Sequence, residues 1–178
     1  MKIKILALVI GSLVTSSIGF AAPLSNLAAG ETAIGYNYYN MSHDADNNDY
    51  YLEGSLSDKF TVGVERNNYS AHSADWNTTD IYAHYKIAPN VQLILGNRDY
   101  DYGNQSDKVF YGVGMTTNLA PKLDGYASVI TSSNTTEWQV GVNYALSNQL
   151  GLNVNYKSNK DDHYDTYEGV GVGLNYKF

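Results

Sequence analysis

The last thirteen residues of the chain alternate strictly between two kinds of side chain. Val170, Val172, Leu174, Tyr176 and Phe178 hold every second position, and mostly small or polar residues hold the positions between them. Successive side chains of a β-strand point to opposite faces. This segment therefore predicts a strand with one apolar face and one small or polar face, and with an aromatic residue at its end.

The same alternation appears in many other parts of the chain, and short turns separate these parts. Four similar segments, at 56–60, 87–91, 119–123 and 146–150, each place turn-forming residues between two apolar ones. They alternate with longer polar stretches. This punctuation predicts ten strands, with eight as the alternative if two of the short segments are merged or excluded. The predicted strands lie at 31–41, 49–56, 59–69, 78–87, 91–102, 108–119, 122–132, 135–146, 149–158 and 166–178.

Alternation alone does not decide which face is inside, because a soluble lipocalin-like barrel would bury its apolar face. Two features favour the opposite arrangement. Glycine falls mostly on the polar face, which suits a narrow lumen, and aromatic residues gather near both strand ends, as in a membrane-spanning barrel. We therefore expect an all-β fold, a closed antiparallel up-and-down transmembrane β-barrel. The predicted aromatic girdles are Tyr85, Tyr144, Tyr176 and Phe178 near the tight turns, and Tyr38, Tyr50, Tyr111, Trp138 and Tyr156 near the longer loops.

Three strands depart from the clean pattern. Arg66 and Asn97 are expected on the outward face, although both are polar. A long side chain such as that of Arg66 can reach the head-group region from the barrel wall. In the seventh strand the pattern places Tyr126 and Ile130 inside and Gly125 outside, the reverse of the usual distribution.

The N-terminal residues predict export. Lys2 and Lys4 precede a short apolar run at 5–14, and Gly19–Ala21 fits a small-residue cleavage site. Such a segment is typical of a secretory signal peptide, and its apolar run is too short to span a bilayer core of about 30 Å. We expect a signal peptide at 1–21, a short periplasmic lead-in at 22–30 and the barrel at 31–178.

The chain is acidic and has no cysteine. Its net charge is −7, and removal of the two lysines of the signal peptide lowers it to −9. An acidic chain repels nucleic acid, so we expect no nucleic-acid partner. Without cysteine, neither a disulfide nor thiol chemistry is available.

The inward face of the predicted strands carries acids and bases in similar numbers. Buried charges must be paired, and an interior of eight strands is just wide enough for side chains. We therefore expect an ion-pair network that fills the lumen, with a narrow channel for small solutes or cations as the alternative. The predicted network consists of Glu53, Glu65, Asp80, Lys86, Arg98, Lys108, Asp124, Glu137, Lys157 and Lys177, with His84 among them.

The polar stretches hold three histidines beside acids, but no catalytic or metal site is predicted from them. The spacing from Asp44 begins like a calcium loop, yet it lacks the glycine at the sixth place, and Ser55 stands where the last ligand should be. Asp162 and His163 could suggest a hydrolase, but the chain has no room for a cleft above the membrane. We expect no enzyme, no cofactor and no metal.

The sequence resembles the small bacterial outer-membrane β-barrel proteins, the broad group with the opacity-type proteins and the OmpX-like and OmpA-like barrel domains. The resemblance covers about 31–178 and is most specific at 170–178. It implies a multi-pass protein of the cell outer membrane in contact with lipid and lipopolysaccharide. It also implies that the barrel assembly machinery reads Tyr176 and Phe178. The group implies a structural or surface-interaction role without naming an extracellular ligand.

Overall fold

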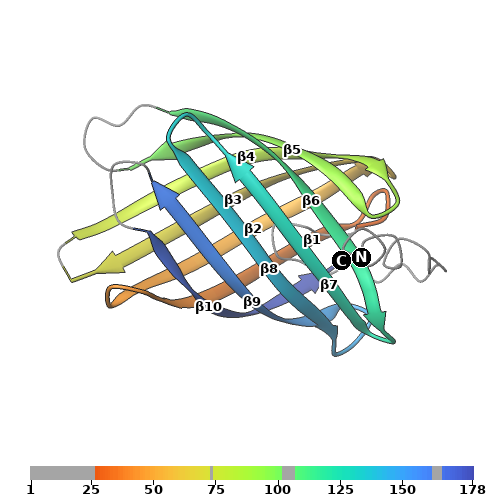
Figure 1. Ribbon diagram of the computed structural model, residues 1–178. Helices are drawn as coiled ribbons and strands as arrows, with labels where there is room; N and C mark the ends of the chain where they lie inside the picture. Colours follow the sequence, from red (N-terminus) through yellow and green to blue (C-terminus); the bar gives the residue numbers. More distant parts are fainter. Residues whose placement is uncertain (1–26, 73, 102–106, 162–165) are drawn as a thin grey trace, which may run out of the picture.

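The computed structural model describes residues 27–72, 74–101, 107–161 and 166–178, which form one closed antiparallel β-barrel. Each strand pairs with the next in sequence, and the first pairs with the last (Figure 1). The described residues contain no helix that is long and apolar enough to cross a membrane. The strands are β1 (Thr32–Met41), β2 (Ala45–Ser57), β3 (Phe60–Ala71), β4 (Ala74–Ala88), β5 (Val91–Tyr100), β6 (Lys108–Ala120), β7 (Leu123–Thr131), β8 (Thr135–Ala145), β9 (Leu150–Asp161) and β10 (Tyr167–Lys177).

The predicted count of ten strands is confirmed, and the alternative of eight is wrong. Three strands run three or more residues further into the polar stretches than the sequence pattern predicts. β2 begins at Ala45 instead of residue 49, β4 begins at Ala74 instead of 78, and β9 ends at Asp161 instead of 158. Here the outward-facing residues are polar, so the alternation between an apolar outer face and a polar inner face is lost, yet side chains still pair across strands. Asn47 of β2, for example, donates a hydrogen bond to Asn67 of β3 at 2.7 Å.

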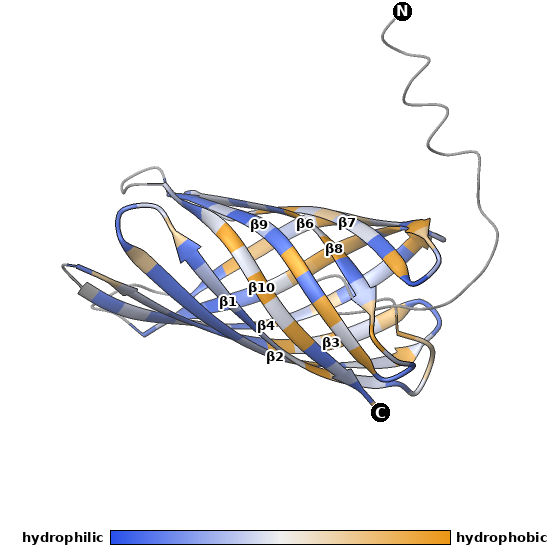
Figure 2. Ribbon diagram, turned by 90° about the horizontal axis from the view of Figure 1, so that it is seen from below, coloured by the Kyte–Doolittle hydropathy of each residue, from blue (hydrophilic) through white to orange (hydrophobic). Residues whose placement is uncertain are grey.

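The apolar face points outward, as predicted. Val170, Val172 and Leu174 are about half exposed, at 54%, 50% and 51%, whereas inward-facing Asn175 is 2% exposed. Figure 2 shows apolar and polar residues alternating along β9 and β10. A barrel with an apolar outside and a polar inside matches transmembrane barrels and excludes the lipocalin-like arrangement.

The irregular strands also follow the predicted register. Tyr126 of β7 is buried in the lumen at 4% exposure, and Val129 of the same strand is exposed at 40%. Arg66 faces outward and lies 3.3 Å from Asp101, and it donates a hydrogen bond to Thr79 at 2.9 Å. The outward charge is therefore paired on the barrel surface.

Inward glycines make room for inward tyrosines on neighbouring strands. A Cβ atom on Gly63 would lie 2.6 Å from the ring of Tyr82, and one on Gly141 would lie 2.6 Å from the hydroxyl of Tyr126. Both distances are too short for real carbon atoms, so only glycine permits these rings to lie flat across the wall. The glycine-rich polar face is thus a requirement of a lumen packed with aromatic rings.

One end of the barrel carries the two-residue turns 58–59, 89–90 and 121–122, and we call it the turn end; the other is the loop end. Part of the predicted lead-in lies across the turn end. Leu27 is 1% exposed, and the N–H of Gly30 donates to the carbonyl of Ser55 at 2.8 Å. The Lys86 ammonium donates to the Leu27 carbonyl at 3.5 Å. The predicted signal peptide lies outside the described residues.

Candidate functional site in the barrel lumen

Arg98 of β5 lies in the middle of the lumen and holds two carboxylates. Its Nε and Nη2 donate to the two carboxylate oxygens of Asp80 at 2.8 and 2.6 Å, a bidentate contact. Its Nη2 also donates to Glu137 of β8 at 3.3 Å. The Arg98 side chain is 6% exposed. Such a contact requires β5 and β8, which are not neighbours in the sheet, to face one another across the interior.

Lys157 of β9 is the second central cation and is completely buried, at 0% exposure. Its Nζ lies 3.5 Å from Glu65 of β3 and 3.5 Å from Glu137, and it donates to Asn67 at 3.2 Å. Glu137 thus contacts both cations. The five charged residues form an ion-pair chain across the lumen, in the order Asp80, Arg98, Glu137, Lys157 and Glu65.

Two further buried acids lie near this chain and bind neutral donors. Glu53 accepts a hydrogen bond from the Tyr82 hydroxyl at 2.8 Å, and its Oε1 lies 4.0 Å from Nδ1 of His84. Asp49 accepts a hydrogen bond from the amide of Asn37 at 2.9 Å. Asp49 is not among the predicted network residues, because the sequence pattern places it at the edge of a polar loop.

Neutral amides line much of the remaining lumen wall, and sequence reasoning that counted only charges did not select them. Gln139 donates to the hydroxyl of Tyr39 at 2.9 Å and to Asn155 at 3.0 Å. Asn153 donates to Asn143 at 2.7 Å. The sequence feature that could have identified these amides is asparagine at alternate positions of β9, on the face opposite the apolar one.

The ten predicted network residues separate into two groups. Glu53, Glu65, Asp80, Arg98, Glu137 and Lys157 are buried together in the middle of the lumen. Lys86, Lys108, Asp124 and Lys177 are only partly buried and bind locally near the ends of their strands. The period of a strand predicts which face a residue occupies but not its height in the barrel, so the sequence could not separate the groups.

The contacts of the end group are local. Lys108 donates to Asn134 at 2.6 Å, and Asp124 accepts from Asn118 at 3.0 Å. Lys177 lies 3.1 Å from Glu31, just before β1. Partial burial acts to raise the pKa of Glu31, but the N–H of Ala28 and the Lys177 ammonium outweigh it and hold that pKa below its ordinary value.

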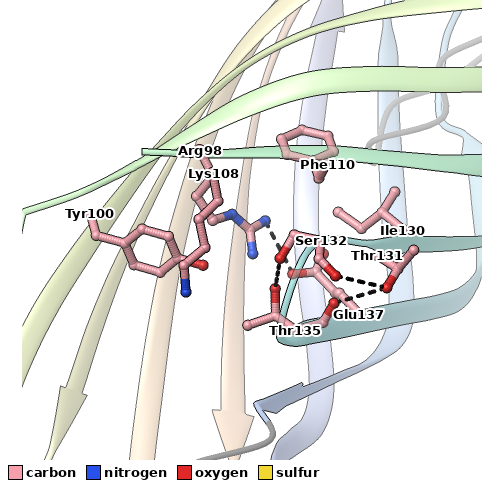
Figure 3. Close-up of a pocket in the computed structure, with 9 residues that line it drawn as sticks. All are labelled: Arg98, Tyr100, Lys108, Phe110, Ile130, Thr131, Ser132, Thr135 and Glu137. Atoms are coloured by element: carbon pink, nitrogen blue, oxygen red, sulfur yellow. Dashed lines mark hydrogen bonds and ion pairs between the residues drawn. The ribbon is translucent and has the colours of Figure 1, made fainter. Parts of the chain in front are cut away.

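Two cavities lie beside the central residues on the β4–β8 side. The outer cavity is lined by the side chains of Arg98 and Lys108 and by hydroxyl-bearing residues at the β7–β8 connection (Figure 3). The inner cavity is lined by Glu65, Asp80, Tyr82, His84, Ile94, Phe110, Ser128, Ile130 and Glu137. Phe110, Ile130 and Glu137 line both cavities.

The histidines outside the lumen bring together no catalytic arrangement among the described residues. His43 lies 3.2 Å from the Ser42 hydroxyl, but that hydroxyl donates to the carbonyl of Thr166 at 3.1 Å and joins the β1–β2 turn to β10. His163 lies outside the described residues. In the described part of the chain no three His, Asp or Glu side chains stand close enough to hold a metal ion.

The two predicted assembly residues lie on the outer wall at the seam of the barrel. Tyr176 and Phe178 are 41% and 63% exposed, and their ring centres are 6.1 Å apart. The backbone N–H and carbonyl of Phe178 both bond to Thr32 of β1 at 3.0 Å. The C-terminal residue thus closes the last pairing of the sheet while its ring faces outward.

No protein-family model and no curated protein sequence matches the chain. Solved structures do match it. The KdgM porin is similar with 12% identity and a TM-score of 0.50, over 82% of this chain and 99% of that chain. The N-terminal barrel domain of Pseudomonas aeruginosa OprF has 10% identity and a TM-score of 0.47, over 85% and 100%. A designed transmembrane β-barrel has 14% identity and a TM-score of 0.46, over 86% and 99%. The ten-stranded closed barrel, its apolar outer wall and the likeness to the KdgM porin together show that the chain has the fold of the outer-membrane β-barrel proteins.

Proposed function

We propose that the protein is a non-enzymatic, closed barrel of the outer membrane with a structural or surface-interaction role. The observation that carries this proposal is the complete burial of Lys157, at 0% exposure, among Glu65, Glu137 and Asn67. In an open, water-filled pore an inward lysine would be hydrated. Here the lysine and its partners fill the cross-section on the β9–β3 side, and Arg98 with its two carboxylates extends this filling toward β5.

The outer wall supports the proposed location. Its apolar side chains end in exposed aromatic residues near both strand ends, which suits lipid between two head-group regions. We propose that this wall contacts outer-membrane lipid and lipopolysaccharide, that the segment 1–21 directs export, and that the assembly machinery reads Tyr176 and Phe178. The turn end would then face the periplasm and the loop end the cell exterior.

The loop end is the part of this barrel suited to surface interaction. β2, β4 and β9 carry polar residues on their outward faces there, including the half-buried Asp46 and the exposed Asp75, so these strand ends belong in water rather than in lipid. The chemistry of this rim is acidic, and it would favour basic over acidic surfaces as partners.

Single-channel recording on the full chain in planar bilayers tests the closed lumen. We expect no discrete conductance steps under conditions in which a porin, inserted by the same procedure, conducts. The competing function is a narrow cation channel, which the two cavities meeting at Glu137 favour. Reproducible cation-selective steps would establish this competing function and refute the closed barrel.

A further inference from the structure

Leu27, which precedes the first strand, is buried inside the turn end of the barrel. Its side chain is 1% exposed, whereas outward apolar residues such as Val172 and Leu174 are about half exposed because neighbours cover only one side of them. Lys86 lies on the same inward face of β4 as His84, and its ammonium donates to the Leu27 carbonyl at 3.5 Å. Burial to this degree, with an inward partner, places the leucine within the lumen rather than on the wall.

The strands leave room for this leucine. Several buried inward residues near the turn end are small, and their side chains reach only a short way into the lumen. They include Ala33, Ser55, Thr61 and Ala145. An apolar side chain that inserts among them is removed from water, which stabilises the docked segment.

The segment 27–30, which we call the strap, turns sharply before it joins β1. Gly30 has a φ of 85°, in the left-handed region that glycine adopts without a steric penalty. The Glu31 carboxylate accepts a hydrogen bond from the N–H of Ala28 at 2.8 Å and lies 3.1 Å from Lys177 of β10. The N–H of Gly30 donates to the carbonyl of Ser55 in β2 at 2.8 Å. Together with the contact to β4, these contacts hold the strap across the turn end.

The strap lies next to the internal space of the barrel. His84 of β4 and Ile94 of β5 line the inner cavity. The next inward residues of these two strands toward the turn end are Lys86, which binds the strap, and Gln92, which is buried. The inner cavity therefore ends one layer of side chains from the strap. Its other end adjoins the outer cavity near the loop end.

We propose that the strap is a removable stopper that closes the turn end of the lumen and separates the inner cavity from the periplasm. This inference rests on the proposed closed barrel and adds the means by which one end of it opens. The ten paired strands need no change when the strap leaves, because the strap contributes no strand to the sheet. Its release exposes one leucine and frees a few polar groups that water can solvate.

The first test measures access to the inner cavity through a single thiol. The chain has no cysteine, so Ser128→Cys, on the cavity wall, is labelled without background. In the full chain folded in detergent, its reaction with a small charged methanethiosulfonate should be slow. Addition of Leu27→Gly should accelerate the reaction by about tenfold or more, because the strap loses the side chain that holds it in place.

The matched control is Leu56→Gly, added to the same Ser128→Cys protein. Leu56 belongs to the same end of the barrel, but it is 67% exposed on the outer wall, so the rate should stay that of the parent. An acceleration by Leu56→Gly as large as that by Leu27→Gly would reflect general loosening of this end and would overturn the proposal.

The labelling rates also separate the stopper from the closed barrel. Equally slow reaction with and without Leu27→Gly would overturn the stopper and leave the closed barrel standing. Equally fast reaction would overturn both, because the cavity would already be open in the parent protein.

A second measurement does not require the strap to be weakened. Leu27→Cys and Ala29→Cys, made separately, place single thiols two residues apart. Ala29 is exposed, so its thiol should react freely, whereas the thiol at position 27 should react about tenfold or more slowly because it is docked in the lumen. Circular dichroism verifies that each variant is a folded barrel. Equal rates at the two positions in folded protein would show that the strap is not docked and would refute the stopper.

Discussion

Removal of the Arg98 charge is the sharpest test of a lumen filled by paired charges. Arg98→Met keeps a long side chain but removes the bidentate contact with Asp80 and the contact with Glu137. Asp80 would then lose its only ion-pair partner among the described residues, whereas Glu137 would keep Lys157 at 3.5 Å. Breaking a buried pair costs about 3–5 kcal/mol. For a chain of this size that cost corresponds to a midpoint lowered by roughly 6–20 °C.

The matched control is Arg66→Met. Arg66 also forms an ion pair, 3.3 Å from Asp101, but the two side chains are 43% and 66% exposed. Exposed pairs contribute at most about 1 kcal/mol, so this variant should unfold nearly like the original chain. Both variants can be measured by urea unfolding from lipid vesicles, followed by the fluorescence of Trp76 and Trp138.

Stability and conductance together decide between the two models of the lumen. In a filled lumen, Arg98→Met should be far less stable than Arg66→Met, and a second change, Asp80→Asn, should restore part of the loss by removing the unpaired charge. In a wet pore, Arg98→Met should unfold like the control and should shift ion selectivity toward cations. An Arg98→Met protein as stable as the control and without conductance would refute the reasoning for both models.

Three further outcomes follow from the wall and its ends. Deletion of Phe178 should reduce the amount of barrel in the outer membrane, measured by quantitative blotting of membrane fractions; unchanged levels would contradict its proposed role in assembly. Gly63→Ala should destabilise the barrel by roughly 1–3 kcal/mol, because the added carbon would lie 2.6 Å from a tyrosine ring, whereas Gly54→Ala, with its nearest atom at 3.8 Å, should be tolerated. The folded pKa of Glu31 lies below its ordinary value of 4.5, so its ion pair contributes stability at neutral pH and loses it as the pH falls through that lowered pKa. Glu31→Gln should therefore cost less than about 1 kcal/mol at pH 7 and nothing at pH 2, in unfolding measured at both values.

The wall of the barrel could be predicted almost completely from the sequence, because its two faces meet different solvents. Lipid selects apolar residues at every second position, and the polar lumen selects the others, so a period of two survives wherever a strand crosses the membrane. Val170 to Phe178 show this most clearly. The prediction failed at the loop ends of β2, β4 and β9, where the outward residues are polar and the period vanishes while the backbone pairing continues.

The contacts across the lumen could not be predicted, because they depend on the closure of the sheet. Lys157 and Glu65 are separated by 92 residues in sequence, yet their side chains lie 3.5 Å apart. The strand tilt and the stagger of the closed barrel decide which inward residues share a height, and no local pattern encodes either. The sequence therefore predicted only a set of inward-facing charged residues, with similar numbers of acids and bases.

The balance between inward acids and bases changes once the position of each residue along the barrel axis is known. Three of the predicted bases, Lys86, Lys108 and Lys177, lie near strand ends and are only partly buried. Among the predicted acids only Asp124 lies there, and Asp49, which was not predicted, is buried with the central acids. A chain that looks neutral along its inward face thus concentrates acid in the middle and base at the ends. The electrostatics of this lumen are a property of the closed barrel rather than of its residue composition.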